Sequence, residues 1–162
     1  MRYNYYPILL NTPIDRLYSA EYKIEDNGKI FENINFIGFI DRIDKNDDNS
    51  YTIYDYKTGN NKNSSIKPDG DHEDYYNQIA FYKYYFEKLT NKKVKYTQFI
   101  YPEDFKTKND SFELTDEECE KIVSKIKIAV DKINNCCFEP SYNKNTCQYC
   151  QYKDFCETDI IW

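Results

Sequence analysis

Long apolar segments are absent from this chain of 162 residues, and no run comes near the roughly 20 residues needed to cross a bilayer. The opening residues 1–7 also lack the charged and then apolar order of a secretory signal peptide. We therefore expect a cytoplasmic protein. In that compartment, the six cysteines suit metal binding or free thiols better than disulfides.

Positive charge is also scarce, since 22 Lys and Arg face 28 Asp and Glu, for a net charge of −6. Duplex DNA favours basic proteins, so this balance counts against a broad phosphate-binding surface. It does not exclude a nuclease, because a metal site concentrates carboxylates whose charge the ions offset. Aromatic residues are plentiful, with 18 Tyr and 10 Phe, and this excludes a disordered chain.

The first part of the chain has the β-branched and aromatic composition of strands. A strand is expected at about 20–24, ended by the turn signal at 26–28. Two further strands, 33–42 and 51–57, flank the polar stretch 44–50. This arrangement predicts a β-hairpin.

Helices are expected in the remainder, after a polar loop at 59–71. Spacings of three and four predict a helix over about 73–89. Its buried face would contain Tyr75, Ile79, Tyr82, Phe86 and Leu89. A strand at 94–101 precedes a second helix, which Thr115 and Glu118 open as a capping box. Its buried stripe would contain Ile122, Val123, Ile126, Val130 and Ile133. The order of elements predicts an α/β (α+β) sandwich.

The predicted hairpin carries a candidate chemical site. Because strand side chains alternate faces, Asp55 and Lys57 project from the same side, and the hairpin brings Asp41 across from Asp55. Two carboxylates suit Mg²⁺, which activates water, and Lys57 could orient or deprotonate that water or stabilise the developing anion. An exposed salt bridge at a hairpin end fits the same spacing.

Four motifs resemble those of a known family. The strings at 38–44 (GFIDRID) and 55–59 (DYKTG) resemble the central motifs of RecB-type nucleases, and 78–82 (QIAFY) resembles their Gln-x-x-x-Tyr motif. Cys147-x-x-Cys150 followed by Cys156 resembles C-terminal cysteines that bind a [4Fe–4S] cluster. These nucleases are a branch of the PD-(D/E)XK superfamily, which includes the nuclease domains of RecBCD and AddAB helicase–nucleases and CRISPR-associated exonucleases.

The resemblance implies a restriction-endonuclease-like core, in which helices flank a central mixed sheet, with a cysteine-bearing C-terminal tail. It implies that Asp41 and Asp55 bind Mg²⁺ or Mn²⁺ and that Lys57 is catalytic. Gln78 and Tyr82 would steady the site or contact the DNA strand, although simple packing and a solvated amide explain them too. The family also places a carboxylate ahead of the hairpin, for which Glu21 is the best match.

The expected function is a metal-dependent deoxyribonuclease, acting as an exonuclease or end-processing enzyme in DNA repair, recombination or foreign-DNA processing. RNA fits the same site as a substrate. A different reading is a non-catalytic iron–sulfur or zinc module that binds DNA and docks on a helicase partner.

Two family features are missing. Members carry an upstream helix with a His near the metal and, in the iron–sulfur subset, the first cluster Cys, whereas here the one His is His72 and the first Cys is Cys119. We therefore expect 1–162 to be a single nuclease domain without that helix, as a piece of a larger protein, a shortened gene product or a member that dispenses with it.

Residues 136–162 are expected to form a cysteine metal-binding tail. Its fourth ligand would be Cys136 or Cys137, for iron–sulfur or equally for Zn²⁺, or the site would be incomplete. Cys119 is expected to be a buried thiol on the second helix.

Overall fold

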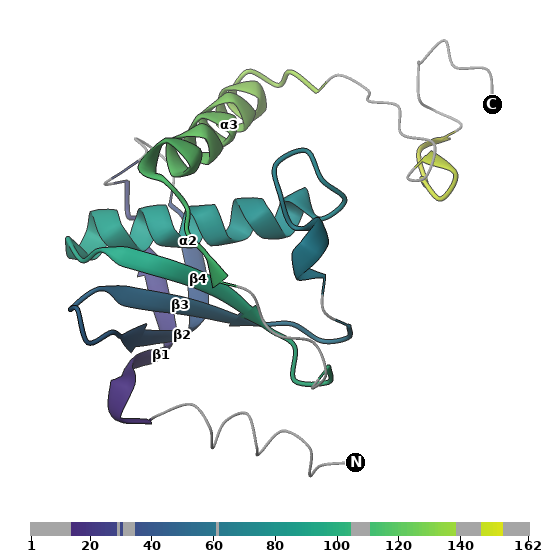
Figure 1. The fold of residues 1–162 in the computed structure, drawn as a ribbon. Coiled ribbons are helices and arrows are strands. Elements are labelled where there is room, and N and C mark those ends of the chain that lie inside the picture. Colours follow the sequence, from purple (N-terminus) through teal and green to yellow (C-terminus); the bar gives the residue numbers. More distant parts are fainter. Residues whose placement is uncertain are drawn as a thin grey trace. The chain divides into compact units, whose positions relative to one another are not determined.

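Five strands pair into one sheet in the computed structural model of the chain, which describes residues 14–28, 30, 35–60, 62–104, 111–138 and 147–153 (Figure 1). The chain forms two compact units, Met1–Lys125 and Ile126–Trp162. The described elements are η1 (Ile14–Arg16), β1 (Leu17–Glu25), β2 (Ile37–Lys45), β3 (Tyr51–Tyr56), η2 (Asn63–Ser65), α2 (Glu73–Thr90), β4 (Val94–Ile100), β5 (Ser111–Phe112) and α3 (Asp116–Asn134).

The sheet is mixed, with strand order β1-β2-β3-β4-β5. Its neighbours run antiparallel except β3 and β4, which are parallel. A parallel pair needs a crossover connection, and α2 supplies it between these two strands. The predicted α/β fold with a central mixed sheet is thereby confirmed.

The hairpin of β2 and β3 is also confirmed, with a small shift in its bounds. Lys45 still pairs with Tyr51, so β2 extends two residues into the stretch predicted as a turn. The turn then closes through the Asn46 N–H, which donates to the Ser50 carbonyl at 2.8 Å. The two-residue strand β5 was not predicted, since it exists through pairing with Thr97 and Gln98 on β4.

The core of the first unit lies between the sheet and α2. Ile43 and Ile53 of the hairpin, Phe99 of β4 and Ile79 and Phe86 of α2 are at most 1% exposed. Burying each such side chain stabilises the fold by about 1.5–3 kcal/mol. Figure 1 shows α2 lying along one face of the sheet. This packing fixes α2 over the strands that carry Asp41 and Asp55.

Both predicted helices form, but the buried face of each differs in part from the predicted one. In α2, Tyr76 and Tyr85 are buried whereas Tyr75 and Tyr82 are half-buried. Tyr76 is drawn into the interior because its hydroxyl donates a hydrogen bond to Glu118 of α3 at 2.8 Å. In α3, burial of Ile122 and Val123 is confirmed, while Ile133 is 58% exposed and its predicted burial is wrong. No described helix is long and apolar enough to span a membrane.

Candidate active site

The hairpin brings Asp41 and Asp55 together. The last paired residues are Arg42 and Tyr54, and continuing that register by one step sets Asp41 level with Asp55. Beyond this last pair, the two strands are joined by a side-chain hydrogen bond and not by a backbone one. The Tyr56 N–H donates to Asp41 Oδ2 at 2.7 Å. The carboxylate of Asp41 is therefore fixed by the backbone of the strand that bears Asp55.

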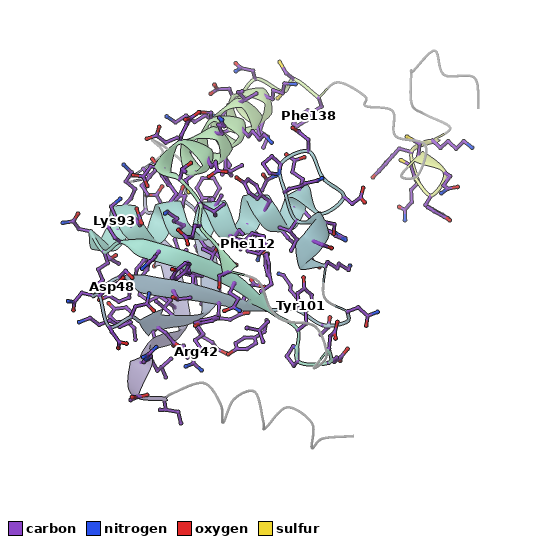
Figure 2. All side chains as sticks on the ribbon, in the orientation of Figure 1. Arg42, Asp48, Lys93, Tyr101, Phe112 and Phe138 are labelled. Atoms are coloured by element: carbon purple, nitrogen blue, oxygen red, sulfur yellow. The ribbon has the colours of Figure 1, made fainter. Side chains whose placement is uncertain are left out.

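Arg42, next to Asp41, points elsewhere. Figure 2 shows it on the side of the sheet away from α2. Its Nε and Nη2 donate to the two carboxylate oxygens of Asp44 at 2.7 and 2.9 Å, and both side chains are buried. The positive charge of Arg42 is thus neutralised on the opposite face, outside the candidate site.

Asp55 carries a buried carboxylate beside Lys57. It is 4% exposed, and its Oδ1 forms an ion pair with Lys57 Nζ at 2.7 Å. Apart from Lys57, this oxygen has no polar partner among the residues that the structure describes. Burial raises the pKa of Asp55, Lys57 lowers it in part, and Asp41 raises it further. A desolvated carboxylate next to a second carboxylate costs free energy that a divalent cation would offset, so the residues present fit a metal ion.

Lys57 lies directly after β3 and is held at both ends. Its backbone N–H donates to the Ile100 carbonyl at 2.9 Å, and its Nζ donates to Gln78 Oε1 at 2.8 Å. The rings of Tyr75 and Phe99 lie 4.8 and 5.4 Å from the same nitrogen. The ammonium is therefore enclosed by β3, β4 and α2.

Gln78 and Tyr82, one turn apart on α2, continue this network. An ammonium only donates hydrogen bonds, so the Gln78 carbonyl oxygen faces Lys57 and its Nε2 donates to the Tyr82 hydroxyl oxygen at 3.0 Å. The Tyr82 hydroxyl hydrogen is left for another acceptor. Burial raises the pKa of Tyr82, although the bond from Gln78 opposes this. Gln78 and Tyr82 are therefore part of a hydrogen-bonded chain that ends at Lys57.

Glu21 lies level with Asp41 in the register of β1 and β2, because its neighbours Ala20 and Tyr22 pair with Arg42 and Ile40. It lies on β1, is exposed, and has a φ of 46°, an unusual value for a residue other than glycine. Within the described ranges, no three His, Cys, Asp or Glu side chains gather in a way that could hold a metal ion. The assignment of Glu21 to the site remains a prediction.

The cysteines of the second unit lie in two places. Cys136 and Cys137 are exposed free thiols just past the end of α3, and the Cys150 N–H donates to the Cys147 carbonyl at 3.1 Å in a tight turn. Cys156 lies outside the described residues. The described cysteines do not assemble a metal site with three ligands.

Cys119, in the first unit, is buried in α3 as predicted. Burial raises the pKa of its thiol to about 11.

Two aromatic residues beside Lys57 were not predicted to belong to the site. Tyr75 was expected only as part of the buried face of the helix, and Phe99 only as a strand residue. The place of Tyr75 could have been predicted, because Tyr75 lies three residues before Gln78 and therefore on the same face of the helix. Phe99 pairs in register with Asp55 across the parallel strands, a relationship that only the fold establishes.

Comparison with known proteins identifies the class. Residues 10–157 match the family model of the PD-(D/E)XK nuclease superfamily. The chain therefore belongs to this superfamily.

Two solved structures are similar in fold. One is described as a "Putative exonuclease" from Eubacterium rectale, with 14% identity and a TM-score of 0.50, and the match covers 89% of this chain and 53% of that one. The other is SSO0001, with 14% identity and a TM-score of 0.47, covering 96% of this chain and 66% of that one. The chain thus spans about half the length of the first protein. A search of curated proteins found no significant match.

Proposed function

We propose that this chain is a divalent-metal-dependent nuclease that hydrolyses phosphodiester bonds of DNA. The observation that carries the proposal is the buried carboxylate of Asp55, which lies 2.7 Å from Lys57 Nζ on the strand whose backbone bonds Asp41. Membership of the PD-(D/E)XK superfamily supports nuclease chemistry at such a site. The choice of DNA rests on the resemblance of the motifs at 38–44, 55–59 and 78–82 to RecB-type nucleases.

Asp41 and Asp55 would hold Mg²⁺ or Mn²⁺, because hard divalent cations take carboxylate oxygens. When bound, the ion supplies Lewis-acid chemistry that polarises phosphate oxygens and offsets their charge. Asp41 keeps its Oδ1 for this role while Oδ2 is bonded to Tyr56. Asp55 is already desolvated, so its oxygens interact strongly with a cation.

Lys57 would act on the reacting phosphate through electrostatics. Its Nζ lies 2.7 Å from the buried carboxylate of Asp55. Gln78 occupies one of its three N–H groups, and a remaining N–H is available to a phosphate oxygen. There it would stabilise the negative charge that develops in the transition state. Tyr82 would donate its hydroxyl hydrogen to the nucleic acid or to a water molecule.

We further propose that the substrate is a DNA end or a single strand and that the chain acts in DNA repair, recombination or foreign-DNA processing. The name of the Eubacterium rectale neighbour agrees with exonuclease action. A helicase partner is proposed from the same RecB-type motifs.

The cysteine tail supports a second, non-catalytic candidate role. A backbone turn links Cys147 and Cys150, and the thiols of Cys136 and Cys137 are exposed. Cys147, Cys150 and Cys156, with Cys136 or Cys137 as the fourth ligand, would hold a [4Fe–4S] cluster or Zn²⁺ and form a DNA-binding or scaffold module. Metal analysis of the purified chain tests this role. Iron with sulfide, or zinc, at one site per chain supports it, and metal-free protein contradicts it.

The nuclease proposal is tested by incubating the chain with linear and circular DNA, single- and double-stranded, and with RNA, with Mg²⁺, Mn²⁺ or a chelator. We expect metal-dependent loss of linear DNA, abolished in Asp55→Ala and Lys57→Ala. A matched control is the exposed pair of Lys95 on β4 and Asp48 in the turn between β2 and β3, 3.0 Å apart, whose alanine variants should cleave normally. Full cleavage by either site variant would refute the assignment.

A further inference from the structure

Two aromatic rings enclose the ammonium group of Lys57. The ring centroid of Tyr75 lies 4.8 Å from Nζ, that of Phe99 lies 5.4 Å away, and the two rings are 5.3 Å apart. Both distances lie within the range in which a cation is attracted to the face of a ring. Phe99 is fully buried and belongs to β4, so its position is set by the sheet.

Tyr75 differs from Phe99 in being only half-buried. It lies in the first turn of α2. The imidazole of His72 stacks on it at 5.5 Å with an interplanar angle of 21°, and Lys62 Nζ lies 5.9 Å from its ring. His72 and Lys62 thus flank the Tyr75 ring in addition to Lys57 and Phe99.

Lysine has a flexible four-carbon stem and can place its charge in many directions. In this site Gln78 takes one N–H, Asp55 faces the charge, and the ring of Tyr75 covers a further side. Without that ring, the ammonium gains access to water and to rotamers that leave Asp55. We propose that Tyr75 is a positioning residue, which holds the Lys57 ammonium at the carboxylates through the face of its ring. This inference rests on the proposed nuclease function of Lys57.

The test compares Tyr75→Phe, which keeps the ring face, with Tyr75→Leu, which keeps bulk but loses the ring. Tyr84→Leu is the matched control, because Tyr84 holds Lys88 at 5.3 Å on the same helix, away from the site. We expect Tyr75→Leu to lower kcat on the order of tenfold with little change in KM. Tyr75→Phe should retain most of the activity and Tyr84→Leu all of it. If Tyr75→Leu does not stay folded, Tyr75→Met replaces it.

A second readout needs no activity. In metal-free protein labelled with ¹³C-lysine, ring currents should place the ε-methylene protons of Lys57 upfield of those of exposed lysines. The signal is assigned by its loss in Lys57→Arg. It should stay upfield in Tyr75→Phe and Tyr84→Leu and move toward the exposed position in Tyr75→Leu. If kcat falls equally in the Phe and Leu variants, or if the signal does not move in Tyr75→Leu, the proposal is wrong. A wild-type chain that cleaves nothing refutes the nuclease function, and the NMR signal still decides the position of Lys57.

Discussion

The carboxylate of Asp41 accepts a hydrogen bond at 2.7 Å from the backbone N–H of Tyr56, the residue between Asp55 and Lys57. This bond joins β2 to the end of β3 just beyond their last paired residues. One oxygen of Asp41 thereby serves the sheet, and the other takes no part in this bond. The distance between Asp41 and Asp55 is therefore set by the pairing of β2 with β3.

A first prediction separates these two roles of Asp41. Asp41→Ala removes the acceptor and leaves the Tyr56 N–H unpaired, which should lower the free energy of unfolding by about 1–3 kcal/mol. Asp41→Asn keeps an acceptor oxygen and should lose much less stability, while both variants lose cleavage. Urea unfolding without metal measures the difference. Equal stability losses would show that the bond to Tyr56 does not hold the strands.

A second prediction concerns the link from Tyr82 through Gln78 to Lys57. Gln78→Ala removes the acceptor at 2.8 Å and frees the ammonium, which should lower kcat by about a hundredfold, the scale of a small misplacement. Tyr82→Phe keeps the ring and removes only the hydroxyl, so its effect on kcat measures that group alone. Steady-state kinetics checks both variants. Unchanged kcat in both variants would show that Gln78 and Tyr82 only pack the helix against the sheet.

A third prediction follows from the capping box of α3. The Thr115 backbone N–H donates to Glu118 Oε2 at 2.7 Å, and this bond lowers the pKa of Glu118 although burial opposes it. A carboxyl with a depressed pKa in the fold stabilises the fold above its ordinary pKa, and that stability is lost as the pH falls through the folded value. Glu118→Gln should flatten the acid branch of a melting-temperature profile. Glu120→Gln, exposed in the next turn, is the control and should leave the profile unchanged.

That capping box was predictable from the sequence because its bonds join residues three apart. The pairing of Asp55 with Lys57 was predictable for a similar reason, since residues two apart on a strand share a face. Lys83 was not, because it is buried and donates to the carbonyls of Val94 at 3.1 Å and Leu114 at 2.7 Å, which only the tertiary fold brings near. The contact of Tyr75 with Lys57 depends on the crossover in the same way.

A fourth prediction concerns the end of α3. Cys136 has a φ of 52°, and the N–H groups of Cys136 and Cys137 donate to Ile133 at 3.1 Å and Lys132 at 2.8 Å. This is the Schellman arrangement, in which glycine is favoured at the left-handed position. Cys136→Gly should stabilise the last turn by about 1 kcal/mol, seen as slower amide exchange there. Cys136→Ala, which keeps the strain, should not. Slower exchange in both variants would point to the thiol and not to the backbone.

The central claim is that the buried carboxylate of Asp55, with Asp41, holds a divalent cation beside Lys57. Titration of the folded chain with Mn²⁺, followed by the electron paramagnetic resonance of the free ion, measures this directly. The wild-type chain should remove Mn²⁺ from solution, whereas Asp55→Asn, of nearly the same shape, should not, although it remains folded. Equal Mn²⁺ binding by the two proteins would contradict the assignment of Asp55 as a ligand.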